Sequence, residues 1–203
     1  MNSIIKKLVE ANIERIENNE FELVYDRALS LNHKLDVGEL TDIFYAAGID
    51  PLAHLSEIPS LFLDESKITA LVVPENIKKI RNSGFAFSNL NHIELHKDCE
   101  LSERSFYGSK IESIVIPYIM NEVPNDCFYG CSWLSEVDLN AIEQIGAEAF
   151  AHCKHLKQLF LPDDINYIAD TAFYECPVTF LFHSDNEYAI DYCQRTKQEY
   201  RFV

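Results

Sequence analysis

Two histidines and a glutamate alternate along one short segment, at His92, Glu94 and His96. In a β-strand these positions share one face, and two imidazoles with a carboxylate form a ligand set that zinc accepts. Side chains on one strand stand nearly parallel, however, whereas a metal site needs ligands that converge from several elements. The spacing therefore favours a polar patch on an exposed sheet, and we predict no bound metal.

Three of the six cysteines recur at a regular interval, at Cys131, Cys153 and Cys176. Stacked repeats would bring such residues within about 5 Å of one another, the spacing of adjacent strands. That spacing would suit a ladder of disulfides or metal ligands, but cysteine is also among the most frequently buried residues. No Cys-x-x-Cys pair occurs, and thiols stay free in a reducing compartment. We expect all six cysteines to be reduced, with these three packed in the core.

The motifs that organise common active sites are missing from the sequence. Gly-x-Ser-x-Gly, His-Glu-x-x-His, the P-loop and Gly-x-Gly-x-x-Gly do not occur, and only six glycines are available for phosphate-binding loops. Serine, histidine and aspartate are present, but no spacing brings them together. We therefore expect no catalytic residues, no cofactor and no enzymatic activity.

Acidic residues outnumber basic ones in a chain of otherwise globular composition. The 203 residues include 33 Asp and Glu against 17 Lys and Arg, a formal net charge of −16, and 47% are hydrophobic. Phosphate backbones and anionic membranes attract clustered Lys and Arg, so we expect neither nucleic acid nor membrane as a direct partner. The acidity either keeps the protein soluble or imitates a phosphate backbone and occupies a nucleic-acid-binding protein.

The first 50 residues are predicted to form short helices. Apolar residues recur at helical spacing between Ile4 and Ile16 and again between Phe21 and Leu29. A third helix is expected between Asp36 and Gly48. The first twenty residues alternate apolar and charged types, unlike a secretory signal, and no window has the length of a transmembrane helix. We expect a cytoplasmic protein.

An internal repeat dominates the rest of the chain. Stretches with the pattern Ile-Thr-Ala-Leu-Val-Val-Pro start at residues 68, 90, 111, 134, 156 and 178, at spacings of 22, 21, 23, 22 and 22. One unit of this length cannot cover its own apolar face, so the repeat predicts a solenoid whose stacked units share a continuous core. In each full unit an aliphatic residue stands five positions before a phenylalanine: Ile80/Phe85, Leu101/Phe106, Val123/Phe128, Ile145/Phe150 and Ile168/Phe173.

The segment from Ile142 to Leu156, which reads Ile-Glu-Gln-Ile-Gly-Ala-Glu-Ala-Phe-Ala-His-Cys-Lys-His-Leu, resembles the BspA-type leucine-rich repeat. Residues 122–131 and 165–176 repeat it with changes, and residues 184–193 are similar to the helical terminal cap common in that family. The resemblance covers residues 67–203. It implies a leucine-rich-repeat fold without catalytic residues, and binding of a ligand or protein, often at bacterial or protozoan surfaces.

These patterns predict an α+β protein, a short leucine-rich-repeat solenoid with a helical N-terminal cap and a C-terminal capping helix. We place the helical N-terminal cap domain at residues 1–50, a connecting segment at 51–66 and the BspA-like leucine-rich-repeat domain at 67–203.

The outward-facing strand positions are the candidates for partner binding, because solenoids commonly bind along an extended face. Alternate residues of a strand point to opposite sides, so the outward ones form a stripe that mixes apolar and acidic residues. A merely solvated sheet is the alternative. The candidate partner-binding residues are Val72, His92, Glu94, Val115, Glu136, Asp138, Gln158 and Phe160.

We therefore expect a non-catalytic protein–protein interaction module that binds a protein partner through the repeat sheet, the acidic helices, or both. A repeat protein with its own helical header would suit a phage or mobile-element protein that acts on a host factor. The alternative is an acidic nucleic-acid mimic that inhibits a nucleic-acid-binding protein. The sequence specifies neither the partner nor the oligomeric state.

Overall fold

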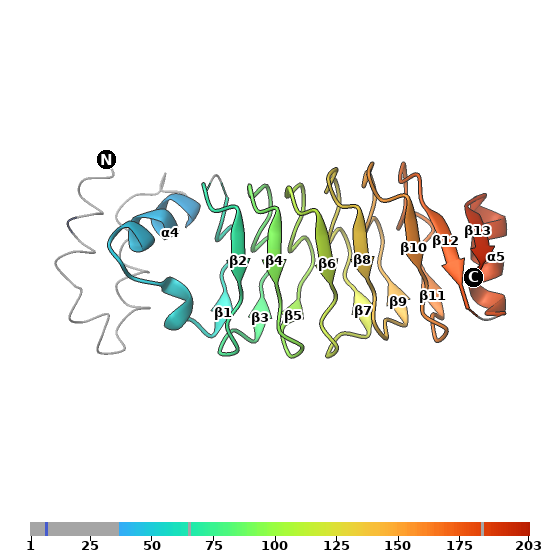
Figure 1. The fold of residues 1–203 in the computed structure, drawn as a ribbon, viewed down its shortest axis with the longest axis horizontal. Helices are drawn as coiled ribbons and strands as arrows, with labels where there is room; N and C mark the ends of the chain where they lie inside the picture. Colours follow the sequence, from blue (N-terminus) through green and yellow to red (C-terminus); the bar gives the residue numbers. More distant parts are fainter. Residues whose placement is uncertain (1–6, 8–36, 65, 184) are drawn as a thin grey trace.

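The repeats wind into a solenoid whose turns stack along one axis (Figure 1). The structure is a computed structural model that describes Lys7 and residues 37–64, 66–183 and 185–203. The helices expected before residue 37 lie outside the described residues, so the helical N-terminal cap stays a prediction. The helix expected between Asp36 and Gly48 is present as α4, Val37–Ala46.

Each turn of the solenoid contributes two short strands, one to each of two columns. The first column contains β2 (Ala70–Val72), β4 (His92–Glu94), β6 (Ser113–Val115), β8 (Glu136–Asp138), β10 (Gln158–Phe160), β12 (Thr179–Phe182) and β13 (Glu199–Phe202). The second column contains β1 (Glu57–Ile58), β3 (Lys79–Ile80), β5 (Glu100–Leu101), β7 (Glu122–Val123), β9 (Gln144–Ile145) and β11 (Tyr167–Ile168).

All the strand pairs are parallel, and they join equivalent residues of successive turns. Ile145, for example, lies opposite Val123 on one side and Ile168 on the other. The ladders form five sheets, ordered β1-β3-β5, β7-β9-β11, β2-β4, β6-β8 and β10-β12-β13. A one-residue slip would move every aliphatic side chain out of the core, so the spacing of 21 to 23 residues follows from this register.

The predicted phenylalanine column is confirmed, and it runs through the centre of the core. Phe106, Phe128, Phe150 and Phe173 are buried, and their rings stack with centroids 5.2–5.3 Å apart and interplanar angles of 9–12°. Phe85 continues the column toward the N-terminus at 5.4 Å with a tilt of 44°. Each ring covers the next, so the aromatic core is continuous from turn to turn.

The backbone turns sharply on both sides of four of the core phenylalanines, and after Phe173 only Glu175 repeats this conformation. Two residues before Phe150, Glu148 has a φ of 56°, and two residues after it His152 has a φ of 62°. The same two positions are left-handed around Phe85, Phe106 and Phe128. Non-glycine residues rarely adopt this conformation, so its recurrence shows that stacking imposes it on each turn.

All six cysteines are buried and free, as expected. The three that recur form a ladder in which each thiol lies against a backbone carbonyl of the preceding turn. Cys131 Sγ donates to the Phe106 carbonyl at 2.9 Å, and Cys153 Sγ donates to the Phe128 carbonyl at 3.2 Å. The ladder therefore packs the core and satisfies turn carbonyls, the role that the packing interpretation assigned to it.

The segment at 51–66, predicted as a connection, supplies the first turn of the stack. After the short 3-10 helix η2 (Pro51–Ala53), β1 pairs with β3, and both Phe62 and Leu63 are fully buried. Leu63 stands five residues after Ile58, as the phenylalanine does in later turns, and the ring of the neighbouring Phe62 meets Phe85 edge-on with centroids 6.5 Å apart. Thr41 of α4 donates a hydrogen bond to the Phe62 carbonyl at 3.0 Å, which attaches that helix to the first turn.

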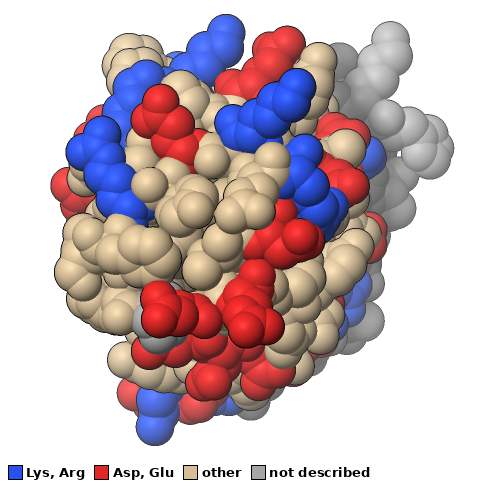
Figure 2. All heavy atoms as spheres, turned by 90° about the vertical axis from the view of Figure 1, so that its right-hand side faces the viewer, with Lys and Arg blue, Asp and Glu red and all other residues tan. Residues whose placement is uncertain are grey.

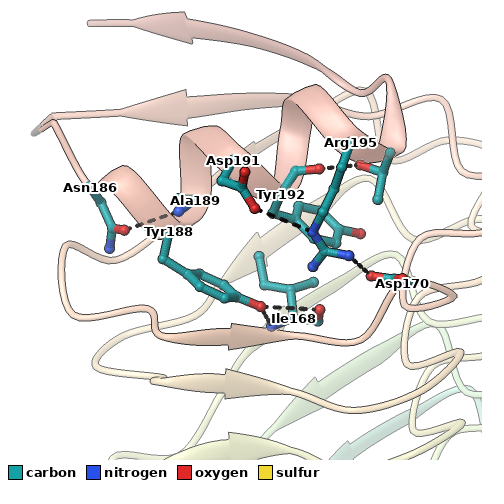
Figure 3. A network of polar contacts seen from close by, with 9 residues as sticks. Ile168, Asp170, Asn186, Tyr188, Ala189, Asp191, Tyr192 and Arg195 are labelled. Carbon is teal, nitrogen blue, oxygen red and sulfur yellow. Dashed lines mark hydrogen bonds and ion pairs between the residues drawn. The ribbon is translucent and has the colours of Figure 1, made fainter.

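The expected C-terminal helix is present as α5, Glu187–Thr196, and it covers the last turn (Figure 3). The Asn186 side chain accepts a hydrogen bond from the Ala189 amide and so caps its N-terminus. The Tyr188 hydroxyl accepts from the Ile168 amide at 2.7 Å and donates to the Ile168 carbonyl. Arg195 pairs with Asp170 of the preceding turn. The two Tyr188 contacts satisfy backbone groups at the open edge of β11.

Candidate interaction face

The first strand column presents one continuous outward face, here called the strand face. Its members occupy two rows in register, because β2 pairs with β4, β6 with β8 and β10 with β12. The structure places all eight sequence candidates on it. The first row contains His92, Glu136 and Gln158, and the second contains Val72, Glu94, Val115, Asp138 and Phe160.

Large apolar side chains lie among carboxylates on the strand face. Val72 is 63% exposed and Val115 is 55% exposed. Contact of an apolar side chain with water is unfavourable, so burying either valine against a partner would lower the free energy. Phe160 is partly shielded, because its ring lies 4.1 Å from that of His183 on the next turn. Such mixed surfaces suit a protein partner better than a polar solute, since burying the valines would release ordered water.

The middle of the strand face is hollowed into a groove of about 680 Å³. It runs across β4, β6 and β8, and its walls include Glu94, Val115, Glu136 and Asp138. The residues that line it, all within the described part of the chain, include neither lysine nor arginine. The groove therefore combines apolar side chains with three carboxylates and no lysine or arginine.

A second hollow of about 540 Å³ continues the acidic surface toward the C-terminal end. Asp138 belongs to both hollows, and Asp163 and Asp164 line the second beside Phe160. The strand face and the loop after β10 thus carry carboxylates along several successive turns. A ligand with spaced positive charges would match this arrangement.

The alternating His92, Glu94 and His96 do not converge on one point. His92 Nε2 lies 3.5 Å from a Glu94 carboxylate oxygen, whereas His96 Nε2 contacts the Ile77 carbonyl at 2.6 Å. Because a carbonyl only accepts, His96 Nε2 carries the proton and donates it. In residues 37–64, 66–183 and 185–203, no three His, Cys, Asp or Glu side chains are grouped to hold a metal ion.

Sequence reasoning missed a second aromatic column, which runs along the turns outside the core. Each member stands either one or two positions after the core phenylalanine of its turn, so a strict repeat alignment does not reveal them. Tyr107 and Tyr129 stack at 4.7 Å with an interplanar angle of 6°, and Tyr129 continues to His152 at 5.0 Å. The column extends to Phe87 at one end and Tyr174 at the other.

Charge is unevenly distributed at the C-terminal end of the solenoid. In Figure 2 most Lys and Arg lie in the upper half of this end, with some Asp and Glu among them, while a band of Asp and Glu runs below the centre. The negative net charge of the chain is therefore not spread as one uniform anionic coat.

Parallel strands stacked turn on turn around one core column are typical of solenoid repeat proteins, which include the leucine-rich repeats. The family model for the BspA type leucine rich repeat region, in six copies, matches residues 56–179. The chain belongs to this family. The match begins inside the segment predicted as a connection, in agreement with the position of β1.

Three of the solved structures with a similar fold are bacterial proteins. The pneumococcal vaccine antigen PcpA is 23% identical with a TM-score of 0.56, over 66% of this chain and 37% of that chain. A leucine rich cell surface protein from Faecalibacterium prausnitzii is 25% identical with a TM-score of 0.56, over 65% and 38%. A leucine-rich repeat protein from Bacteroides ovatus is 20% identical with a TM-score of 0.53, over 71% and 44%.

These comparisons establish the fold of the repeat region. The matched part spans less than half the length of each of these larger proteins. No curated protein matches the chain. None of the helices in the described residues has the length and apolar character needed to cross a membrane.

Proposed function

We propose that the protein is a non-catalytic binding module whose strand face takes up a basic, partly apolar segment of a protein partner. The observation that carries this proposal is the groove across β4, β6 and β8, where Glu94, Glu136 and Asp138 surround the exposed Val115. Lysine or arginine side chains of the partner would pair with the carboxylates, and its apolar side chains would cover the valine. Family membership supports the proposal, since extended solenoid faces commonly bind proteins.

The nucleic-acid mimic is less well supported by the structure. A mimic needs a continuous anionic surface, whereas valines interrupt the strand face and basic side chains share the C-terminal end with acidic ones. Residence in the cytoplasm and a phage or mobile-element origin stay predictions from the sequence. Fractionation of the source cells, with detection of the protein in each fraction, tests the first of these.

Charge reversal in the groove tests the proposed function. A partner is first identified by cross-linking in the source cells and mass spectrometry, and its Kd is then measured with purified proteins. Asp138→Lys should weaken binding at least tenfold, since like charges across an interface repel. Glu175→Lys reverses another exposed acid, beside the outer aromatic column, and should leave the Kd unchanged. Equal Kd values for both variants and the unmodified protein would refute the strand face as the binding surface.

A further inference from the structure

A further groove, separate from the two hollows of the strand face, lies at the edge of the solenoid where the first-column strands begin. It has a volume of about 480 Å³, within the range of small-molecule sites. Its lining comes from residues on either side of the inward aliphatic that starts each repeat, such as Asn89 and Asn91 around Leu90 and Lys110 and Glu112 around Ile111. The repeat therefore arranges two adjacent rows of polar side chains along this edge.

Trp133 closes one end of this groove and presents a flat apolar surface to it. The indole ring is stacked on His155 of the next turn, with centroids 5.3 Å apart and an interplanar angle of 9°. His155 is itself held by a hydrogen bond to the Ser132 carbonyl. All the other lining residues precede Trp133 in the chain and come from earlier turns. The face of the indole ring that is turned away from His155 therefore borders the groove. Trp133 remains 55% exposed, a large apolar area to leave in water.

The turn before Trp133 contributes an ammonium group that is held by a hydrogen bond. Asn89 donates through Nδ2 to the Ser66 carbonyl at 2.8 Å, and its Oδ1 accepts from Lys110 Nζ at 2.6 Å. An ammonium has three donors, so Lys110 keeps two for a ligand. Lys67 lines the same groove. Neither lysine forms an ion pair with a carboxylate in residues 37–64, 66–183 or 185–203.

The charge of this groove contrasts with that of the chain. Two lysines and Glu112 line it, so its formal charge is +1 in a protein of net charge −16. The amides of Asn89 and Asn91 and the hydroxyl of Thr69 add neutral donors and acceptors. A ligand that fits has one flat apolar face, several hydroxyl groups and a single negative charge.

We propose that this groove binds a saccharide that carries one carboxylate, such as a uronic acid or a sialic acid. The C–H face of the sugar ring packs on Trp133, the hydroxyls bond with Asn91 and Glu112, and the carboxylate pairs with Lys110. A nucleotide could also stack on an indole, but its phosphate carries more negative charge, which Glu112 and the acidic chain repel. The site is separate from the strand face and independent of the function proposed above.

Trp133 is the single tryptophan of the chain, so its fluorescence reports directly on this site. The full chain is titrated with galacturonic acid and with sialyllactose, then with galactose and lactose as neutral counterparts and with adenosine monophosphate. We expect a saturable change with at least one of the two acidic saccharides, and a Kd at least tenfold weaker for its neutral counterpart.

Two matched variants complete the test. Lys110→Met should weaken binding of the acidic saccharide at least tenfold, whereas Lys78→Met removes an exposed lysine outside this groove and should leave the Kd unchanged. Calorimetry with Trp133→Ala checks binding without the reporter and should show none. No saturation by either acidic saccharide, equal affinity for its neutral counterpart, or tighter binding of the nucleotide would each overturn the proposal.

Discussion

The inner and outer aromatic columns share one spacing but differ in what surrounds them. Ring centroids are 5.2–5.4 Å apart from Phe85 to Phe173 and 4.7–5.6 Å apart from Phe87 to Tyr174. In both columns the distance between rings is set by the distance between stacked turns. The inner column uses phenylalanine in every one of these turns, whereas the outer one mixes phenylalanine, tyrosine and histidine. Burial therefore restricts the residue type, and stacking alone does not.

The difference follows from what the folded protein loses when a ring of either column is removed. An inner ring fills volume that no water can occupy, so its loss leaves a cavity. An outer ring has water on one side, and a shorter side chain there exposes neighbouring rings without creating a void. We therefore expect the two columns to differ severalfold in their contribution to the free energy of unfolding.

The largest effect is expected at the centre of the inner column. Phe150→Ala should lower the free energy of unfolding by about 3–5 kcal/mol, because the ring is fully buried between Phe128 and Phe173. Urea denaturation followed by circular dichroism measures the change. Tyr174→Ala, in the outer column, is the matched control and should cost less than about 1.5 kcal/mol. Similar losses in both variants would contradict the distinction between the columns.

The inner column could be predicted from the sequence, whereas the outer one could not, and the reason is physical. Core positions repeat strictly, because a shift of the register by one residue would expose all the aliphatic side chains. This periodicity was sufficient to predict the repeat units and the core phenylalanines. Outer rings tolerate a shift of one position, since Tyr129 and His152 still meet although they follow Phe128 and Phe150 by different numbers of residues. The alignment therefore hides them.

The candidate sites differ in the same way. The outward positions of the strand face follow from strand alternation, so the sequence was sufficient to place residues such as Val115 and Asp138. The groove beside Trp133 depends on loop residues that flank the strands. Its features, the stacking on His155 and the bond between Lys110 and Asn89, join neighbouring turns. No local pattern encodes such contacts, and only the lone tryptophan could have drawn attention to them.

A second prediction concerns the end of the solenoid, where no further turn covers β11. Tyr188→Phe removes the hydroxyl that bonds with both the amide and the carbonyl of Ile168. Leaving these two backbone groups without partners should cost about 1–3 kcal/mol of unfolding free energy. Tyr174→Phe removes a hydroxyl from an exposed tyrosine of the outer column and should change stability by less than about 0.5 kcal/mol. Equal effects would show that α5 does not stabilise the end of the stack through this contact.

The third prediction uses the thiols that pack beside the inner column. Burial raises the pKa of Cys131 and that of Cys176 from 9.0 to about 12, and it raises the pKa of Cys153 further. Above pH 9 the unfolded chain loses these protons while the folded chain retains them. The stability that the thiols contribute is therefore complete below pH 9 and is lost as the pH rises toward 12.

At pH 10 this linkage should cost roughly 1 kcal/mol for each buried thiol. Urea unfolding at pH 8 and pH 10 measures the loss of unfolding free energy between the two conditions. Cys131→Ala should make this loss smaller by about the contribution of one thiol. An unchanged difference in that variant would show that Cys131 is not protonated in the folded state at pH 10.

The smallest effect is expected in the middle of the outer column. Tyr129→Ala removes a ring that stacks on Tyr107 at 4.7 Å and meets His152 at 5.0 Å, and it should cost about 0.5–1.5 kcal/mol of unfolding free energy. A double-mutant cycle with Tyr107→Ala isolates the stacking, and we expect a coupling energy within the same range. A coupling near zero would mean that the outer rings only fill the spacing that the inner column sets. A loss as large as that of Phe150→Ala would mean that the outer column is part of the core, and the comparison between the two columns would fail.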